Sequence, residues 1–497
     1  MKSLKPRIDP SSHRASRLPT LVVAIFVTTL AWGCSSDRFL APSGPKVLVC
    51  HFDRSVGSIA EIFASELADH KKHGDYVAQL DVDKSATASD SIHFRRMTDA
   101  LAVARAVRIA RNETEKAACR ITIVAASGVL PGSTSPSSDP AFELFPLIID
   151  VPDITLRGAL KMQVDGSGRA TGVGVANEAT TFAPSPALVV VGGTLPVDRF
   201  SEPIIIVNAH PDGSKGHGAV IEGFVFLSGR TPTETSIGGL GVFSMRARDL
   251  VVRGNRFEGG FTEAIDPRAS SALVERNHLS GKGGSCGICL AGPGDFTVRD
   301  NRLIGPGGLP GVLSVPAAIL PVHPSVEQYA LPATALLTAT ITNNEVRGHL
   351  SKPVGVGLRV GAVGVGAPNV ISTSKVTMTG NNLVGNTFGI IVEAAFPVTG
   401  SALRGDIELT TSGNTISESC QNDVLVSLGR HLTGLGLPSP FPSYLRNSTY
   451  NLSLGADIPW DKAWFAHPAG FGNTLTVNGQ PMPNGSNTAY VASRTCP

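Results

Sequence analysis

The sequence predicts an all-β fold in which short strands repeat as the coils of a solenoid. Gly (54 residues) and Pro (35) are plentiful in the 497-residue chain, whereas 16% of residues are charged and 6% are aromatic. This composition is typical of turn-rich β proteins. Short runs that alternate apolar and polar residues recur along most of the chain, and many of them end at a bend that contains Asn.

The bends give the repeat its period. LVVRGNRFEG, ALVERNHLSG and FTVRDNRLIG are three copies, spaced roughly 22 to 24 residues apart. Each phrase holds three β runs, enough to close one coil, and strand pairing stacks coils about 4.8 Å apart. Asn tolerates the left-handed backbone of a bend and can bond the side-chain amide of the Asn in the next coil. The predicted asparagine column comprises Asn255, Asn277, Asn301, Asn344, Asn381 and Asn414.

A helix is predicted before the repeats, within FRRMTDALAVARAVRIARN, where Met97, Leu101 and Ala104 share one face and Thr98 or Asp99 stands near its start. The β-rich runs CRITIVAASGVLPG and FPLIIDVPDITLRGAL follow it. Helix, runs and repeats together resemble the right-handed parallel β-helix proteins of the pectate-lyase-like superfamily over about residues 92–455. The resemblance implies three-strand coils, a helix that caps the open N-terminal end, and a C-terminal cap over 456–497.

The first 33 residues read as a targeting segment. Five basic residues precede LPTLVVAIFVTTLAWG, which is shorter than the ~20 residues of a membrane span and suits a signal peptide. LAWGC resembles a bacterial lipobox, although Trp32 is unusual there. The resemblance implies cleavage before Cys34, lipidation of its thiol and, because Ser35 follows, sorting to the outer membrane. An ordinary secretory signal or an uncleaved anchor is the alternative. Residues 34–45 then form a tether, and the lipid is the expected membrane contact.

Residues 46–83 predict a small module with two strands and a short helix. His70 and His73 are three residues apart on that helix, so they share a face. With Cys50, His51 and Asp75 they are residue types that zinc takes as ligands. The stretch also resembles a small extracellular bacterial Cys-His/HGD module, but QLDVDK stands where that module has its closing Cys. The alternative is that these histidines only pack and cap the module.

Six cysteines follow Cys34, which in an exported chain permits 15 pairings. Cys286 and Cys289 form a CxxC. In one regular strand they would lie roughly 10 Å apart on opposite faces, too far to bridge. We therefore expect a packing role for them rather than a redox or metal role.

The strand that opens each repeat holds the candidate site. Ile265, Ile288, Leu358 and Ile390 align as inward positions. Alternation then turns four charged residues outward, with Glu263 beside them: Asp266, Arg268, Arg359 and Glu393. A carboxylate next to an Arg could bind a uronate, or a Ca²⁺ ion that bridges to one. The alternative is an ordinary solvated sheet face.

Charge and motifs limit the function classes. The net charge is +2, and the segment before Cys34 holds +4 of it, so the remaining body is near neutral at about −2 and lacks the basic face that nucleic acid needs. GHG (216–218) resembles one element of polygalacturonases, but the aspartate pairs and the Arg-x-Lys that accompany it in that family are absent here. The sequence thus favours an exported, lipid-anchored cell-envelope protein whose β-helix is a non-catalytic scaffold for polysaccharide. The alternative is a polysaccharide lyase, hydrolase or epimerase with its site at the four charged residues.

Overall fold

The computed structural model describes residues 45–53, 56–85, 92–110, 119–133, 138–139, 142–174, 179–184, 203–208, 216–228, 238–281, 286–305, 312–315, 334–349, 355–364, 371–397, 404–420, 423–427, 447–456, 458, 463–466 and 472–483. The predicted signal segment, Cys34 and the tether as far as residue 44 lie outside them. Across the described residues, no helix is both long enough and apolar enough to cross a membrane.

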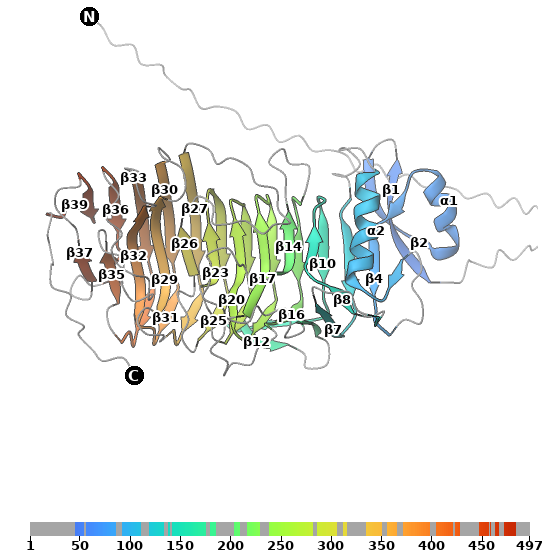
Figure 1. Cartoon of the computed structure of the whole chain (residues 1–497), viewed down its shortest axis with the longest axis horizontal. Coiled ribbons are helices and arrows are strands. Elements are labelled where there is room, and N and C mark those ends of the chain that lie inside the picture. The colour runs from blue at the N-terminus through green and yellow to red at the C-terminus, as the bar shows by residue number, and fades with distance from the viewer. Residues whose placement is uncertain are drawn as a thin grey trace, which may run out of the picture. The chain divides into compact units, whose positions relative to one another are not determined.

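The chain is a right-handed parallel β-helix with three sheets (Figure 1). It visits the sheets in turn, so hydrogen-bonded neighbours within a sheet are usually three strands apart in sequence. Within the described residues, sheet 1 has 14 strands, in the spatial order β39 (Gln480–Pro481), β38 (Thr474–Val477), β36 (Thr449–Ser453), β33 (Arg404–Ser412), β30 (Ile371–Thr379), β27 (Thr334–Thr342), β24 (Gly294–Arg299), β21 (Ala272–Glu275), β18 (Leu250–Arg253), β15 (Val220–Glu222), β10 (Ile154–Arg157), β6 (Ile121–Ala125), β4 (Gln79–Val82) and β5 (His93–Phe94).

Sheets 2 and 3 each have ten strands in the described part of the chain. Sheet 2 comprises β34 (Thr415–Ser417), β31 (Asn382–Val384), β28 (Glu345–Arg347), β25 (Arg302–Ile304), β22 (His278–Ser280), β19 (Arg256–Glu258), β16 (Phe224–Leu227), β13 (Thr180–Pro184), β7 (Gly128–Ser133) and β8 (Glu143–Leu144). Sheet 3 comprises β37 (Ala463–Ala466), β35 (Val424–Ser427), β32 (Phe388–Pro397), β29 (Val356–Gly364), β26 (Val312–Val315), β23 (Cys286–Ala291), β20 (Phe261–Arg268), β17 (Gly238–Met245), β14 (Pro203–Asn208) and β9 (Leu147–Ile149).

The core lies inside the coils, where each strand points alternate apolar side chains inward. Ile265, Ile288, Leu358 and Ile390 occupy one register row of sheet 3 and are fully buried, as the alternation predicts. Aromatic rings also stack from coil to coil. The rings of Phe226 and Phe257 lie 4.6 Å apart and nearly parallel. One coil therefore buries its apolar face only because its neighbours complete the core.

The predicted asparagines form a hydrogen-bonded column at the bend between sheets 1 and 2. Each backbone N–H from Asn255 to Asn381 donates to Oδ1 of the next asparagine at 2.9–3.0 Å. Each Nδ2 also donates to a backbone carbonyl of sheet 1, for example Asn301 to Val274 at 2.9 Å. All six are buried. The column thus satisfies backbone groups that the bend would otherwise leave unpaired inside the protein.

The β-helix is longer than residues 92–455, which corrects the predicted boundaries at both ends. The strand β4, inside the predicted small module 46–83, pairs in parallel with β6. At the other end, β37 and β38 continue sheets 3 and 1 into the predicted C-terminal cap. The physical reason is the same at each end. QLDV and TLTV alternate like any other rung, and their apolar residues are buried in the common core.

The helix α2 (Met97–Ile109) packs against the first strands of all three sheets, as the predicted capping helix should. Its own N-terminal cap comes from a distant strand. The buried carboxylate of Glu143 in β8 accepts hydrogen bonds from the backbone N–H groups of Met97 and Thr98 and from the Thr98 hydroxyl. Burial raises the pKa of Glu143, although these hydrogen bonds act to lower it. Neither Thr98 nor Asp99 caps the helix, because its N-cap residue is Arg96.

The N-terminal module is a small antiparallel sheet, β2–β1–β3, with one helical turn and one short helix. Its elements are β1 (Lys46–Asp53), β2 (Val56–Phe63), η1 (Ala64–Glu66), α1 (Leu67–Lys72) and β3 (Tyr76–Val77). A disulfide joins Cys50 in β1 to Cys119, just before β6. Cys119 thus forms the bridge in a chain that lacks the closing cysteine of the module it resembles.

An antiparallel hairpin, β11 (Met162–Val164) and β12 (Ala170–Gly174), lies against β22 and β25 of sheet 2. Asp165 in its turn pairs with Arg302 at 3.1 Å. Gly172 has φ +79°, and a Cβ there would come within 2.5 Å of the His278 ring. The hairpin therefore covers His278, which is 9% exposed. This burial lowers the pKa of the imidazole to about 4.

Candidate functional site

The outer face of sheet 3 brings together three of the charged residues around the predicted site. Nε of Arg268 donates to Oδ2 of Asp266 at 2.7 Å, and its Nη2 donates to Oε2 of Glu263 at 3.1 Å. The Arg268 guanidinium also lies over the Phe243 ring, 5.3 Å from its centroid. All three charged side chains belong to one strand, β20, in which Asp266 and Arg268 alternate with the inward Ile265. We call Glu263, Asp266 and Arg268 the acid–arginine cluster.

This face is buried rather than solvated, which corrects the expectation of an exposed patch. Asp266 is 0% and Arg268 4% exposed. Their neighbours on the same face are apolar: Ile206, Leu240, Phe243 and Met245 form a separate buried group. Alternation identifies the face of a strand correctly, but it does not show whether that face reaches solvent.

Burial sets the protonation of the acid–arginine cluster. Desolvation raises the pKa of Asp266 well above its usual value, and the neighbouring Glu263 carboxylate raises it further, against the opposing charge of Arg268. The two acidic groups raise the pKa of Arg268, so it stays charged. Among the described residues, Oδ1 of Asp266 has no hydrogen-bond partner although it is buried.

The other two predicted residues do not join this cluster. Arg359 lies in β29, three strands along sheet 3 from β20, or about 14 Å at the usual strand spacing. Glu393 lies in β32, and its side chain is outside the described part of the structure. Only two sets of described residues have the spacing of metal ligands, and neither consists of oxygen ligands alone, as Ca²⁺ prefers.

Cys286 and Cys289 form a disulfide within β23, which corrects the expectation that they could not be bridged. Their Cα atoms are 5.7 Å apart instead of the roughly 10 Å of a regular strand. The strand therefore does not run straight here. The sulfur atoms lie near the Glu263 carboxylate, beside the acid–arginine cluster, but bridged sulfurs offer no thiolate to a metal.

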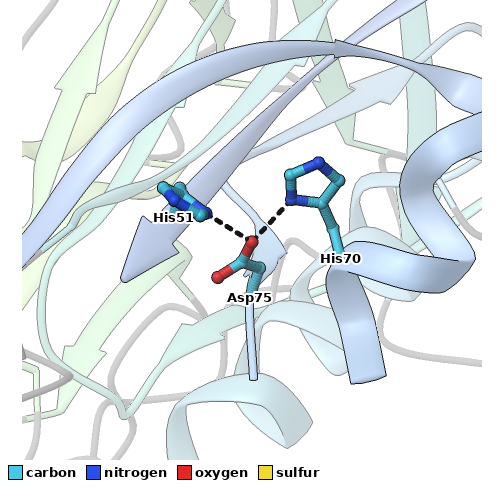
Figure 2. Close-up of side chains that lie close together, drawn as sticks. All are labelled: His51, His70 and Asp75. Atoms are coloured by element: carbon cyan, nitrogen blue, oxygen red, sulfur yellow. Dashed lines mark hydrogen bonds and ion pairs between the residues drawn. The ribbon is translucent and has the colours of Figure 1, made fainter. Parts of the chain in front are cut away.

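A second group forms in the N-terminal module, where His51, His70 and Asp75 converge from three different segments (Figure 2). His51 comes from β1, His70 from α1, and Asp75 from the turn before β3. Gly74, at φ 93°, turns the chain there, and the Asp75 N–H donates to the His70 carbonyl at 3.2 Å. The HGD sequence thus ends the helix and returns the carboxylate to the histidine of the same helix.

One oxygen of Asp75 lies between the two imidazoles. Its Oδ2 is 2.8 Å from Nδ1 of His51 and 2.7 Å from Nδ1 of His70, and its Oδ1 accepts the Phe52 N–H at 3.1 Å. Asp75 is buried, but the His51 and His70 side chains are 41% and 27% exposed. Hydrogen bonds from both imidazoles outweigh burial and lower the pKa of Asp75.

Two of the five predicted metal ligands are not part of this group. Cys50 is excluded because its sulfur is committed to the disulfide with Cys119. His73 is exposed at the end of α1, where its backbone N–H bonds the His70 carbonyl. His70 and His73 share a helical face, but the short helix ends at Lys72. The chain then turns Asp75, not His73, toward His70.

Comparisons with known proteins do not identify a family for this chain. No family model matches the chain, and no curated protein matches it either. Solved structures with a similar fold include an endo-xylogalacturonan hydrolase from Aspergillus tubingensis, at 12% identity and a TM-score of 0.45, covering 81% of this chain and 92% of that one. A mannuronan C-5 epimerase module from Azotobacter vinelandii has 13% identity and a TM-score of 0.32, covering 76% and 94%.

A third structure is an α-1,3-glucanase catalytic unit from Streptomyces thermodiastaticus, at 13% identity and a TM-score of 0.35, covering 85% of this chain and 72% of that one. Such distant similarities carry no argument about activity, because this fold hosts many chemistries. Any assignment has to come from the side chains of this chain.

Proposed function

We propose that this chain is an exported, lipid-anchored envelope protein that acts on a uronic-acid-containing polysaccharide, as a lyase or epimerase, at the acid–arginine cluster. The observation that carries the proposal is the buried Asp266 carboxyl. It is fully buried, its Oδ2 is bonded to Arg268, its Oδ1 has no hydrogen-bond partner among the described residues, and burial raises its pKa. Perturbed carboxyls of this kind concentrate at catalytic sites.

The geometry favours proton transfer over two-carboxylate hydrolysis. Glycosidases of the usual kind hold their two carboxyl groups about 5 Å or more apart, so that a sugar or a water fits between them. Glu263 and Asp266 instead both contact the Arg268 guanidinium. A lyase or an epimerase needs one group that removes a proton beside a sugar carboxylate and one group that returns it.

Each residue of the cluster then has a role. Glu263, whose side chain is 12% exposed, is the member nearest to solvent and serves as the base. Asp266 supplies the returning proton. Arg268 pairs with the uronate carboxylate when one of its own acidic partners gives way, since guanidinium and carboxylate match in a two-point contact. This step requires the face over β20 to open to the polymer.

The test is incubation of the purified chain with a panel of uronic-acid polymers, followed by analysis of unsaturated ends and of the sugar epimers. The wild type should turn over at least one polymer, and Asp266→Asn and Glu263→Gln should lose the activity while keeping the fold. Glu408→Gln, at an exposed position of sheet 1, is the matched control and should stay active. Activity that survives in Asp266→Asn would refute the assignment.

A non-catalytic scaffold that binds polysaccharide is the second candidate. Arg268 favours it, because its two acidic partners hold it and it is 4% exposed, which also describes a structural ion cluster. Under this candidate the chain retains a polymer on a glycan array but leaves it chemically unchanged. Replacing the cluster then lowers stability and leaves binding intact.

A further inference from the structure

We propose that His51, His70 and Asp75 form a binding site for a divalent transition-metal ion, with Zn²⁺ as the natural probe. The ligand atoms are Nδ1 of His51, Nδ1 of His70 and Oδ2 of Asp75, which all lie within 4.8 Å of one another. The inference is independent of the polysaccharide proposal, because it concerns the N-terminal module and not sheet 3.

The donor set selects the kind of metal. Two imidazole nitrogens and one carboxylate oxygen suit Zn²⁺ and its neighbours, whereas Ca²⁺ and Mg²⁺ prefer oxygen ligands throughout. Sites with three protein ligands leave one position to water or substrate. The partly exposed imidazoles place that fourth position on the solvent side, opposite the buried Asp75.

The backbone holds the three ligands before any metal arrives. The Phe52 N–H fixes the second oxygen of Asp75, and the backbone bond from Asp75 to the His70 carbonyl fixes the turn. Next to His51, Cys50 is bridged to Cys119, which fixes this part of β1. Supporting contacts of this kind orient metal ligands and strengthen binding.

Binding requires only a small rearrangement. Ligand atoms of a tetrahedral zinc site lie about 3.3 Å apart, given metal–ligand distances of about 2.0–2.1 Å. The present N···O distances are 2.8 and 2.7 Å, so each ring must move outward by roughly half an ångström. A neutral imidazole that carries its proton on Nδ1 must free that nitrogen for the metal. It releases the Nδ1 proton to solvent and takes up a proton at Nε2, so the charge of the ring is unchanged.

The alternative is a hydrogen-bonded triad that only holds β1, α1 and the HGD turn together. Calorimetric titration of Zn²⁺ into the untagged, chelator-treated full chain separates the two. We expect one equivalent to bind, and Co²⁺ in its place to give the visible absorption of a tetrahedral ion. His70→Gln and Asp75→Asn should weaken binding at least about tenfold. His73→Gln, one helical turn along and outside the group, should bind like the wild type.

Two outcomes overturn the proposal. One is a wild type that takes up no Zn²⁺ at micromolar concentration. The other is a one-to-one site that persists in the His70→Gln chain. Thermal unfolding of each variant with and without Zn²⁺ guards against misfolding, because a bound metal raises the unfolding temperature of the wild type and of His73→Gln only.

Discussion

Asn301 offers the sharpest test of the coil stack. It is fully buried, and its Oδ1 accepts from both the backbone N–H and the Nδ2 of Asn277, at 2.9 and 3.0 Å. Its Nδ2 donates to the Val274 carbonyl and to Oδ1 of Asn344, each at 2.9 Å. Asn301→Ala therefore leaves two to three polar groups unpaired in the interior.

Each orphaned buried group costs about 1–3 kcal/mol, so the loss of two to three partners should lower the free energy of unfolding by about 2–9 kcal/mol. That is a large share of the 5–15 kcal/mol typical of a folded domain. Urea unfolding followed by circular dichroism measures the loss. Asn451→Ala, at an exposed position of β36, is the control and should change the value by less than about 0.5 kcal/mol. Equal small effects at the two sites would refute the buried column.

Three further predictions concern caps and covers. The pKa of His278 is about 4 in the folded chain and 6.5 in the unfolded chain. On acidification the unfolded chain therefore takes up this proton first. Stability should thus hold above pH 6.5 and fall by about 3 kcal/mol toward pH 4, and His278→Gln should flatten this pH profile of unfolding. Glu143→Ala should cost about 1–2 kcal/mol in urea unfolding, because α2 loses the cap at Met97 and Thr98; an unchanged midpoint would contradict this. Cys50→Ala should lower the free energy of unfolding by about 2–4 kcal/mol, and reductant, which also opens Cys286–Cys289, should destabilise the wild type by more than the variant.

The sequence predicted the coils because the repeats are local and periodic. The Asn repeats indicated the bends, and alternation placed Ile265 and Ile288 in one buried row. The same alternation failed at the outer face of β20, where Asp266 is as buried as Ile265. Period-2 patterning distinguishes the two faces of a strand but carries no information about what covers either one.

Long-range partners explain most of the remaining differences. The cap of α2 comes from Glu143, far along the chain, and the partner of Cys50 is Cys119, beyond the module itself. Neither contact leaves a local signature. The prediction for the CxxC was wrong for another reason. The distance expected between Cys286 and Cys289 assumed a regular strand. At the proposed metal site, the sequence suggested both His73 and Asp75, and the turn at Gly74 brings only Asp75 to His70.

Hydrogen exchange at the sugar measures the proposed chemistry most directly. A lyase and an epimerase both remove the proton beside the uronate carboxylate, so a polymer treated in deuterated water should lose that proton's NMR signal. We expect this loss with the wild-type chain and with Glu408→Gln, and none with Asp266→Asn. A polymer that binds to the wild type yet keeps its proton and its length would contradict the catalytic account.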